Sequence, residues 1–275
     1  MKRGRFSLAV AMMVAFLIQV QPFFALDTPP SATRIDLDGN TLQSAPNATS
    51  PREGKTPVIL EVGLPNLQIH KTSLAPSKGT ILVFPGGGYH VIAIEHEGLA
   101  IAAMLNRDGY DVVVLEYSIG KEDTRDLALA EATRALKLIQ QKGPELGINT
   151  TSLGLMGFSA GGHLACRLIH ELGVPSPFTK LILIYPAYLN SPDGILPEVA
   201  PPQGLKTDVF VLIGDKDTTE RVKGSQAYAE VSKANGQYAE YHLVPDAGHG
   251  FGIQPGQKGA VLGWPALLKS FLQGH

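Results

Sequence analysis

Residues 152–169, SLGLMGFSAGGHLACRLI, constrain the fold more than any other stretch. Their first five residues are apolar enough for a buried strand of a parallel sheet, and residues 162–169 continue as a helix with one apolar face. The connection between them, Gly157-Phe158-Ser159-Ala160-Gly161, matches G-x-S-x-G. So tight a turn strains the backbone of Ser159 and holds its hydroxyl above the sheet edge, as a nucleophile requires. An incidental serine in a glycine-rich turn is the alternative, but the flanking strand and helix favour the active-site interpretation.

The rest of the chain alternates strand and helix patterns. Such alternation predicts an α/β fold, a doubly wound, mostly parallel sheet with helices on both faces and its site at the carboxyl ends of the strands. The first two strands are expected to be leading antiparallel strands, and the helix over 123–141 to turn Leu127, Ala130, Leu136 and Ile139 inward. Strands are expected over 58–62, 67–72, 80–84, 111–117, 152–156, 180–185, 209–213 and 239–244, and helices over 95–106, 123–141, 162–169, 220–234 and 259–271.

The N-terminal residues have the pattern of a targeting segment. Three basic residues within the first five precede an apolar run over 8–18 that is short for a membrane span. We therefore expect a signal peptide or an uncleaved N-terminal anchor over 1–26, and a secreted or periplasmic protein that meets a membrane only if that segment is retained. Residues 27–55, rich in Pro, Ser, Thr and Asn, are expected to be a linker or lead-in to a catalytic domain over 56–275.

Composition excludes several other classes of protein. The formal net charge of −2 and the lack of a basic run beyond the N-terminus give no sign of a nucleic-acid partner. The single cysteine, Cys166, permits no intramolecular disulfide. No His, Cys, Asp or Glu residues have metal-ligand spacing, so we expect neither a metal nor a cofactor.

The segment Pro85-Gly86-Gly87-Gly88-Tyr89 follows the strand over 80–84 directly. Glycines leave backbone N–H groups free to fold over a bound oxyanion, and we expect Gly87, Gly88 and Ala160 to donate to it. A phosphate-binding loop is disfavoured because no Gly-Lys-Ser/Thr follows. A purely structural turn is the remaining alternative.

Two further loops offer the acid and the base that a nucleophilic serine needs. The strand over 209–213 runs into Gly214 and then two candidate acids, Asp215 and Asp217, and the Gly-x-x-Asp spacing favours Asp217. The base is expected at His249, flanked by glycines in a loop after the last strand. Serine, acid and base in this chain order predict a nucleophilic triad that forms and hydrolyses an acyl-enzyme.

Five segments together resemble one family: TILVFPGGGYHVIAIEHEGLAIAAMLNRDGYDVVVLEYSI, GFSAGGHLA, LILIYPAY, GDKD and AGHGFG. From about Pro57 onward the sequence is similar to bacterial α/β-hydrolase esterases of the acetyl xylan esterase-like or feruloyl esterase-like type. The resemblance implies an α/β-hydrolase fold and a serine esterase that removes small acyl groups from plant polysaccharide, with Ser159, Asp217 and His249 as its triad. His96 and Glu97 match the family motif without a role derived from the residues. The sequence departs from many relatives at residues 218–220, where they have a Val-Pro turn.

The segment 187–207 is too short for a large lid, which favours a short acyl group on a bulky alcohol such as a carbohydrate, and the resemblance implies that the acyl group is acetyl. A serine peptidase of the prolyl oligopeptidase type shares the chain order but carries a large gating domain that is missing here. A non-catalytic hydrolase-like binding protein would be expected to have lost the serine, the histidine or the glycine loop, and all are present.

Overall fold

The computed structural model describes residues 32–52, 55–120, 124–191 and 194–274. The signal segment predicted over 1–26 lies outside the described residues. None of the helices within those described ranges has both the length and the apolar character that crossing a bilayer requires.

The architecture is one nine-stranded sheet whose order is β13-β12-β9-β8-β6-β7-β5-β1-β2. From β13 to β7 all neighbouring strands are parallel, and β5, β1 and β2 extend the sheet as antiparallel strands. The nine strands are β1 (Thr33–Asp36), β2 (Thr41–Leu42), β5 (Asn66–His70), β6 (Thr80–Phe84), β7 (Asp111–Glu116), β8 (Leu153–Phe158), β9 (Phe178–Ile184), β12 (Asp208–Gly214) and β13 (Ala239–Val244).

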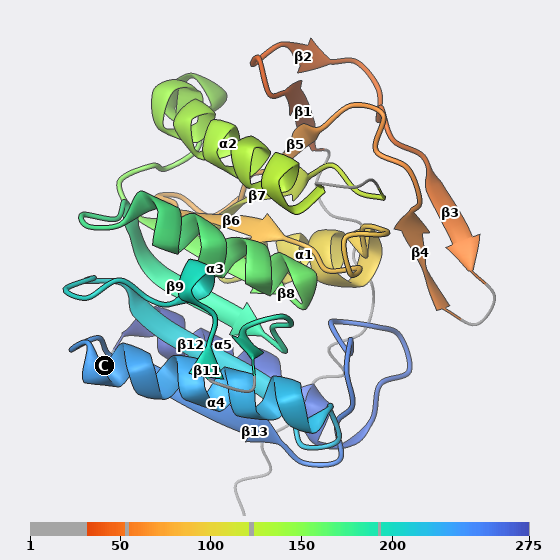
Figure 1. Cartoon of the computed structure of the whole chain (residues 1–275). Coiled ribbons are helices and arrows are strands. Elements are labelled where there is room, and N and C mark those ends of the chain that lie inside the picture. The colour runs from red at the N-terminus through yellow and green to blue at the C-terminus, as the bar shows by residue number, and fades with distance from the viewer. Residues whose placement is uncertain (1–31, 53–54, 121–123, 192–193, 275) are drawn as a thin grey trace, which may run out of the picture.

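Helices cover both faces of the sheet (Figure 1). In that view α2 (Thr124–Leu146), α3 (Ala160–Leu172) and α4 (Thr219–Ala234) lie in front of the sheet. A π turn, η1 (Glu95–Leu99), leads into α1 (Ala100–Arg107), and a 3₁₀ turn, η3 (Gly259–Gly263), leads into α5 (Trp264–Gln273). Both of these helices lie on the opposite face, where Tyr110 just after α1 donates a hydrogen bond to the Leu272 carbonyl of α5 at 3.1 Å.

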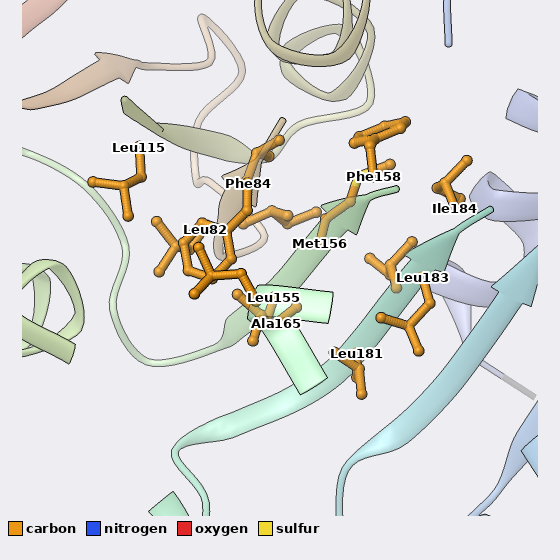
Figure 2. Packing of buried hydrophobic residues seen from close by; sticks show 14 of the residues in the cluster. Leu82, Phe84, Leu115, Leu155, Met156, Phe158, Ala165, Leu181, Leu183 and Ile184 are labelled. Atoms are coloured by element: carbon orange, nitrogen blue, oxygen red, sulfur yellow. The ribbon is translucent and has the colours of Figure 1, made fainter. Parts of the chain in front are cut away.

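The core is continuous through the sheet, because every residue of β5, β6, β7 and β8 is buried. Figure 2 shows side chains of the central strands packed together, among them Leu82, Leu155 and Leu183. Strands buried on both faces need near-continuous apolar sequence, which is why the runs over 80–84 and 111–117 predicted β6 and β7 well. Burial on this scale holds the carboxyl ends of β8, β9 and β12, from which the site is built, in a fixed relation.

The lead-in departs from the prediction. Over residues 32–52 the expected linker is instead structured: β1 pairs with β5 in the main sheet, and β3 (Thr49–Arg52) pairs with β4 (Lys55–Ile59) in a separate two-stranded sheet. The amide of Asn47 donates to the Glu116 carboxylate at 2.5 Å and ties this segment to β7. Backbone pairing and hydrogen bonds of polar side chains, with few apolar residues, therefore fix the lead-in, and its polar composition gave little sign of this structure.

Two smaller predictions about helices also fail. In α2, Leu136 and Ile139 are buried as expected, but Leu127 is 47% exposed and Ala130 is exposed as well. The inward stripe of this helix is instead continued by Ala128 and Ala132. The closing helix was expected from residue 259, but its first five residues form the 3₁₀ turn η3 and the α-helix begins at Trp264.

Candidate active site

Ser159 lies in the sharp turn between β8 and α3, with φ +50° and ψ −116°. Positive φ is rare and costly for a residue with a side chain, so the surrounding packing must hold it there. Gly161 permits that packing: a Cβ atom at this position would lie 2.0 Å from the Phe84 carbonyl oxygen at the end of β6. The strained turn predicted from G-x-S-x-G is therefore the one observed.

The structure brings the three predicted triad residues together. Ser159 Oγ lies 2.7 Å from His249 Nε2, and His249 Nδ1 lies 2.6 Å from Asp217 Oδ2. With the Nδ1 proton donated to the carboxylate, Nε2 of a neutral imidazole is left to accept the serine proton. This arrangement can activate the Ser159 hydroxyl as a nucleophile.

Of the two candidate acids, Asp217 contacts the histidine, and Asp215 is exposed to solvent. The Asp217 side chain is fully buried, and its other oxygen accepts hydrogen bonds from Arg221 Nη1 at 3.0 Å and from the Thr218 N–H at 2.7 Å. Burial alone would raise the pKa of Asp217, but hydrogen bonds from His249, Arg221 and Thr218, with the charge of the histidine, lower the pKa below its usual range. The carboxylate therefore stays ionised beside the imidazole.

The acid loop and the base loop are bound to each other. The Lys216 N–H donates to the Ala247 carbonyl at 2.9 Å, and Asp215 N–H donates to Val244 O at 3.0 Å. Gly214 lets the loops approach closely, because a Cβ atom there would lie 2.1 Å from the Ala247 oxygen. Gly214, the glycine of the Gly-x-x-Asp spacing, thus permits the close contact between the two loops that places His249 opposite Asp217.

Two of the three predicted oxyanion donors, Gly87 and Gly88, lie in the loop over 85–89. The Gly86 N–H is not available to a substrate, because it donates a hydrogen bond to Glu97 Oε2 at 2.6 Å. No hydrogen bond from the Gly87 or Gly88 N–H is present among the described residues, and the Ala160 N–H is at the first position of α3, where a helix offers no acceptor. The structure thus leaves all three predicted donors free to serve a substrate oxygen.

Sequence reasoning missed how this loop is anchored. The Tyr117 hydroxyl donates to the Pro85 carbonyl at 2.5 Å, and the Tyr89 hydroxyl lies 2.8 Å from His163 Nδ1 on α3. Burial, with the charges of nearby arginines, lowers the pKa of His163 to about 3, so its ring stays neutral at ordinary pH. The tyrosines gave no periodic signal, and the only hint was their place, with Tyr117 at the end of a predicted strand and Tyr89 directly after the glycines.

The role of Glu97 was also missed. Its side chain is 2% exposed, and it accepts hydrogen bonds from Gly86 N–H and from the Tyr185 hydroxyl, the latter at 2.8 Å. The segment Glu95-His96-Glu97, a polar interruption between apolar residues, was the available signal. His96 itself contacts Thr56 through Nδ1 at 2.6 Å, away from the serine.

A polar cavity of about 430 Å³ adjoins the oxyanion loop at Gly88. Its lining includes Arg125, His163, Arg167 and Glu198. The Arg125 guanidinium stacks over the Tyr188 ring at 4.6 Å. Elsewhere in the described ranges, no three His, Cys, Asp or Glu side chains converge as ligands of a metal ion would.

Comparison with known proteins agrees with this geometry. Residues 81–198 match the family model described as α/β hydrolase fold. Among solved structures, an α/β hydrolase from a Medee basin deep-sea metagenome library superposes with a TM-score of 0.67 at 22% identity, over 88% of this chain and 96% of that one. The chain has the α/β-hydrolase fold.

Further similarities concern esterases. The acetyl ester-xyloside bifunctional hydrolase of Caldicellulosiruptor lactoaceticus superposes on this chain with a TM-score of 0.66 at 22% identity, over 89% of this chain and 96% of that one. An acetylxylan esterase of Xylanibacter ruminicola is 33% identical over 90 residues, which are 33% of this chain. The matched segments make up between 17% and 36% of the length of the curated relatives, so those similarities are local.

Proposed function

We propose that this α/β hydrolase is a serine esterase that hydrolyses short-chain acyl esters, with acetyl groups on carbohydrate as the favoured substrates. The observation that carries the proposal is the hydrogen-bonded series Ser159–His249–Asp217, with distances of 2.7 and 2.6 Å. Its chain order and its position at the carboxyl ends of β8, β12 and β13 are those of the fold to which the chain belongs.

In this mechanism Ser159 Oγ attacks the ester carbonyl while His249 Nε2 takes the serine proton. Asp217 keeps the imidazole in the required tautomer and stabilises the imidazolium that forms. The Ala160 amide and the glycine amides of the 85–89 loop stabilise the oxyanion, an interaction worth about 10²–10³ in rate for a single donor. His249 then returns its proton to the departing alcohol and activates the water that hydrolyses the acyl-enzyme.

The surroundings of the serine favour a small acyl group and a polar alcohol. Between β9 and β12 the described residues form only a two-stranded hairpin (β10, Asn190–Ser191, and β11, Gly194–Ile195) and a 3₁₀ turn (η2, Pro197–Val199), and no helical cap. The cavity beside Gly88 presents charged and hydrogen-bonding side chains, which suit the hydroxyl groups of a sugar better than a long acyl chain. The acetylxylan esterase and the acetyl ester-xyloside hydrolase named above support the same choice.

The test uses the full chain with p-nitrophenyl acetate, butyrate and octanoate. We expect kcat/KM to fall with chain length and activity to be lost in Ser159→Ala, while Ser270→Ala, at an exposed position of α5, serves as the matched control. A fluorophosphonate probe should label wild type at Ser159 and leave Ser159→Ala unlabelled. Release of acetate from acetylated xylan then tests whether the enzyme hydrolyses acetyl esters of a carbohydrate.

Activity that does not depend on Ser159 would contradict the serine mechanism. Rapid turnover of octanoate with little turnover of acetate would contradict the short-acyl proposal while leaving the mechanism intact. Cleavage of p-nitroanilide peptides in preference to esters would favour the peptidase alternative.

A further inference from the structure

A series of hydrogen bonds runs beneath the active site through Glu97, a buried residue with no part in the mechanism above. The Gly86 N–H donates to Glu97 Oε2 at 2.6 Å, and the Tyr185 hydroxyl donates to Glu97 Oε1 at 2.8 Å. The same hydroxyl oxygen accepts a hydrogen bond from the Gly252 N–H at 2.8 Å. We call this series, Gly86–Glu97–Tyr185–Gly252, the Glu97 bridge.

The Glu97 bridge joins the two loops whose spacing the reaction depends on. Gly86 directly precedes the expected oxyanion donors Gly87 and Gly88, and Gly252 follows the base His249 by three residues. The Tyr185 ring also contacts the His249 ring edge-on, with centroids 5.1 Å apart. One buried carboxylate therefore connects the groups that stabilise the oxyanion to the group that moves the proton.

The backbone around the Glu97 bridge is specialised. Tyr185 has φ +39° directly after β9, although it carries a large side chain, and its N–H donates to the Leu212 carbonyl of β12 at 2.6 Å. Glu97 lies in the π turn η1, a rare conformation that occurs often at functional sites. Strained residues persist where their surroundings determine their conformation. Here the backbone conformations of Tyr185 and Glu97 bring the Tyr185 hydroxyl into contact with the Glu97 carboxylate.

The charge of Glu97 matters for this contact. A carboxylate carries no hydrogen, so it accepts from Gly86 and Tyr185 at once, whereas an amide of the same shape offers one acceptor and one donor. Burial raises the pKa of Glu97 to about 7, and the bonds from Tyr185 and Gly86 and the charge of His249 act against that rise. Two further titratable groups lie near Glu97: Tyr117, whose pKa is raised by burial and by the charges of Tyr89 and Glu97, and His96, whose Nε2 lies 3.6 Å from Glu97 Oε1.

We propose that Glu97 is a positioning residue that, through Tyr185, holds the oxyanion loop and the His249 loop at the separation that catalysis requires. The inference rests on the proposed esterase function and concerns the spacing of its parts. Glu97 does not touch the substrate, because its side chain is enclosed by the two loops and the sheet.

The experiment compares Glu97→Gln, Tyr185→Phe and the double variant in the full chain. A displacement of about 1 Å at a reacting centre can cost about 10²-fold in rate, so we expect kcat for p-nitrophenyl acetate to fall about 10- to 10²-fold in each single variant with KM little changed. Because both substitutions break the same series of bonds, the double variant should be scarcely slower than the worse single variant.

The controls remove comparable groups elsewhere. Glu116→Gln alters a buried carboxylate on β7 that accepts hydrogen bonds from three side-chain amides. Tyr228→Phe removes a buried hydroxyl on α4. Glu116→Gln is expected to lower the free energy of unfolding, because it disturbs three hydrogen bonds, and both variants are expected to leave kcat unchanged. Fully additive effects on kcat in the Glu97 and Tyr185 variants, or an equal loss of kcat in the controls, would overturn the proposal.

A second measurement separates this proposal from the proposed function. Amide hydrogen exchange at Gly86 and Gly252 needs no substrate. Tyr185→Phe should speed exchange at Gly86, and Glu97→Gln should speed exchange at Gly252, because each acts on the far loop through the Glu97 bridge. Independent exchange at the two glycines would refute the bridge even in an active enzyme, whereas coupled exchange in a protein without Ser159-dependent activity would refute only the esterase function.

Discussion

Substitution of Gly161 by alanine tests whether the close approach of α3 to the sheet is what holds the nucleophile in place. A Cβ atom at this position would lie 2.0 Å from the Phe84 carbonyl oxygen and 2.6 Å from that of Pro85. Ordinary contact begins at 3.4 Å, so α3 and the end of β6 must separate by about 1.4 Å. Both opposing atoms belong to the backbone, and no side chain can rotate to relieve the clash.

The consequence is a loss of both stability and rate. Overpacking of this kind costs about 1–3 kcal/mol, and the rigid sheet places Gly161→Ala toward about 3 kcal/mol of the free energy of unfolding. The separation also moves Ser159 away from the oxyanion loop, so kcat should fall by about 10²-fold in the molecules that remain folded.

Urea unfolding followed by circular dichroism measures the first effect, and p-nitrophenyl acetate hydrolysis well below the unfolding midpoint measures the second. Gly263→Ala is the matched control, because a Cβ there meets nothing within 4 Å and φ is −84°. The control should stay within about 1 kcal/mol of wild type at full activity. A Gly161→Ala protein with wild-type stability and kcat would refute the reasoning.

Three further outcomes are expected. Asp217→Asn should lower kcat about 10³- to 10⁴-fold by disturbing the imidazole tautomer, while Asp215→Asn should leave it within about twofold, and equal losses in steady-state assays would overturn the choice of acid. Because the pKa of Glu97 is raised from 4.5 to about 7, the folded state holds a proton that the unfolded chain has released, so this group lowers stability as pH rises between those values. The stability of wild type relative to Glu97→Gln should thus fall by about 3 kcal/mol from pH 4.5 to 7.5 in urea titrations, and a constant difference would argue against a buried ionisable Glu97. Asn47→Ala should cost about 1–3 kcal/mol of unfolding free energy by leaving the Glu116 carboxylate short of a partner, and an unchanged urea midpoint would show that this contact does not stabilise the fold.

The triad was accessible from sequence because each member sits directly after a run of residues that predicts its own strand. Ser159 follows the apolar residues of β8, Asp217 follows β12, and His249 follows β13. Parallel strands bring their carboxyl ends to one edge of the sheet, so local patterns in three separate stretches were enough to predict one site. The Gly-x-x-Asp spacing favoured Asp217 over Asp215 in the same polar loop, and in the structure Asp217 is the one that contacts His249.

The lead-in could not be predicted in the same way. In β1 the burial pattern is carried by Ile35 alone, and β3 is largely exposed. Besides the backbone pairing of β1 with β5, a contact between Asn47 and Glu116, residues 69 positions apart, holds this segment. A polar side chain has no characteristic period along the chain, and it satisfies a buried partner only once the fold has brought the two together.

Glu97 matches a family motif in the sequence, but its structural role could not be derived from sequence for the same physical reason. A reacting group must be exposed in a loop, where glycines and turn residues mark it, whereas the groups that fix its position must be buried and bonded. The three partners of Glu97 in the Glu97 bridge come from the glycine loop, the end of β9 and the histidine loop. No window of sequence contains them together. Local sequence motifs therefore predict the candidate catalytic residues, whereas contacts that exist only in the folded chain set the distances between them.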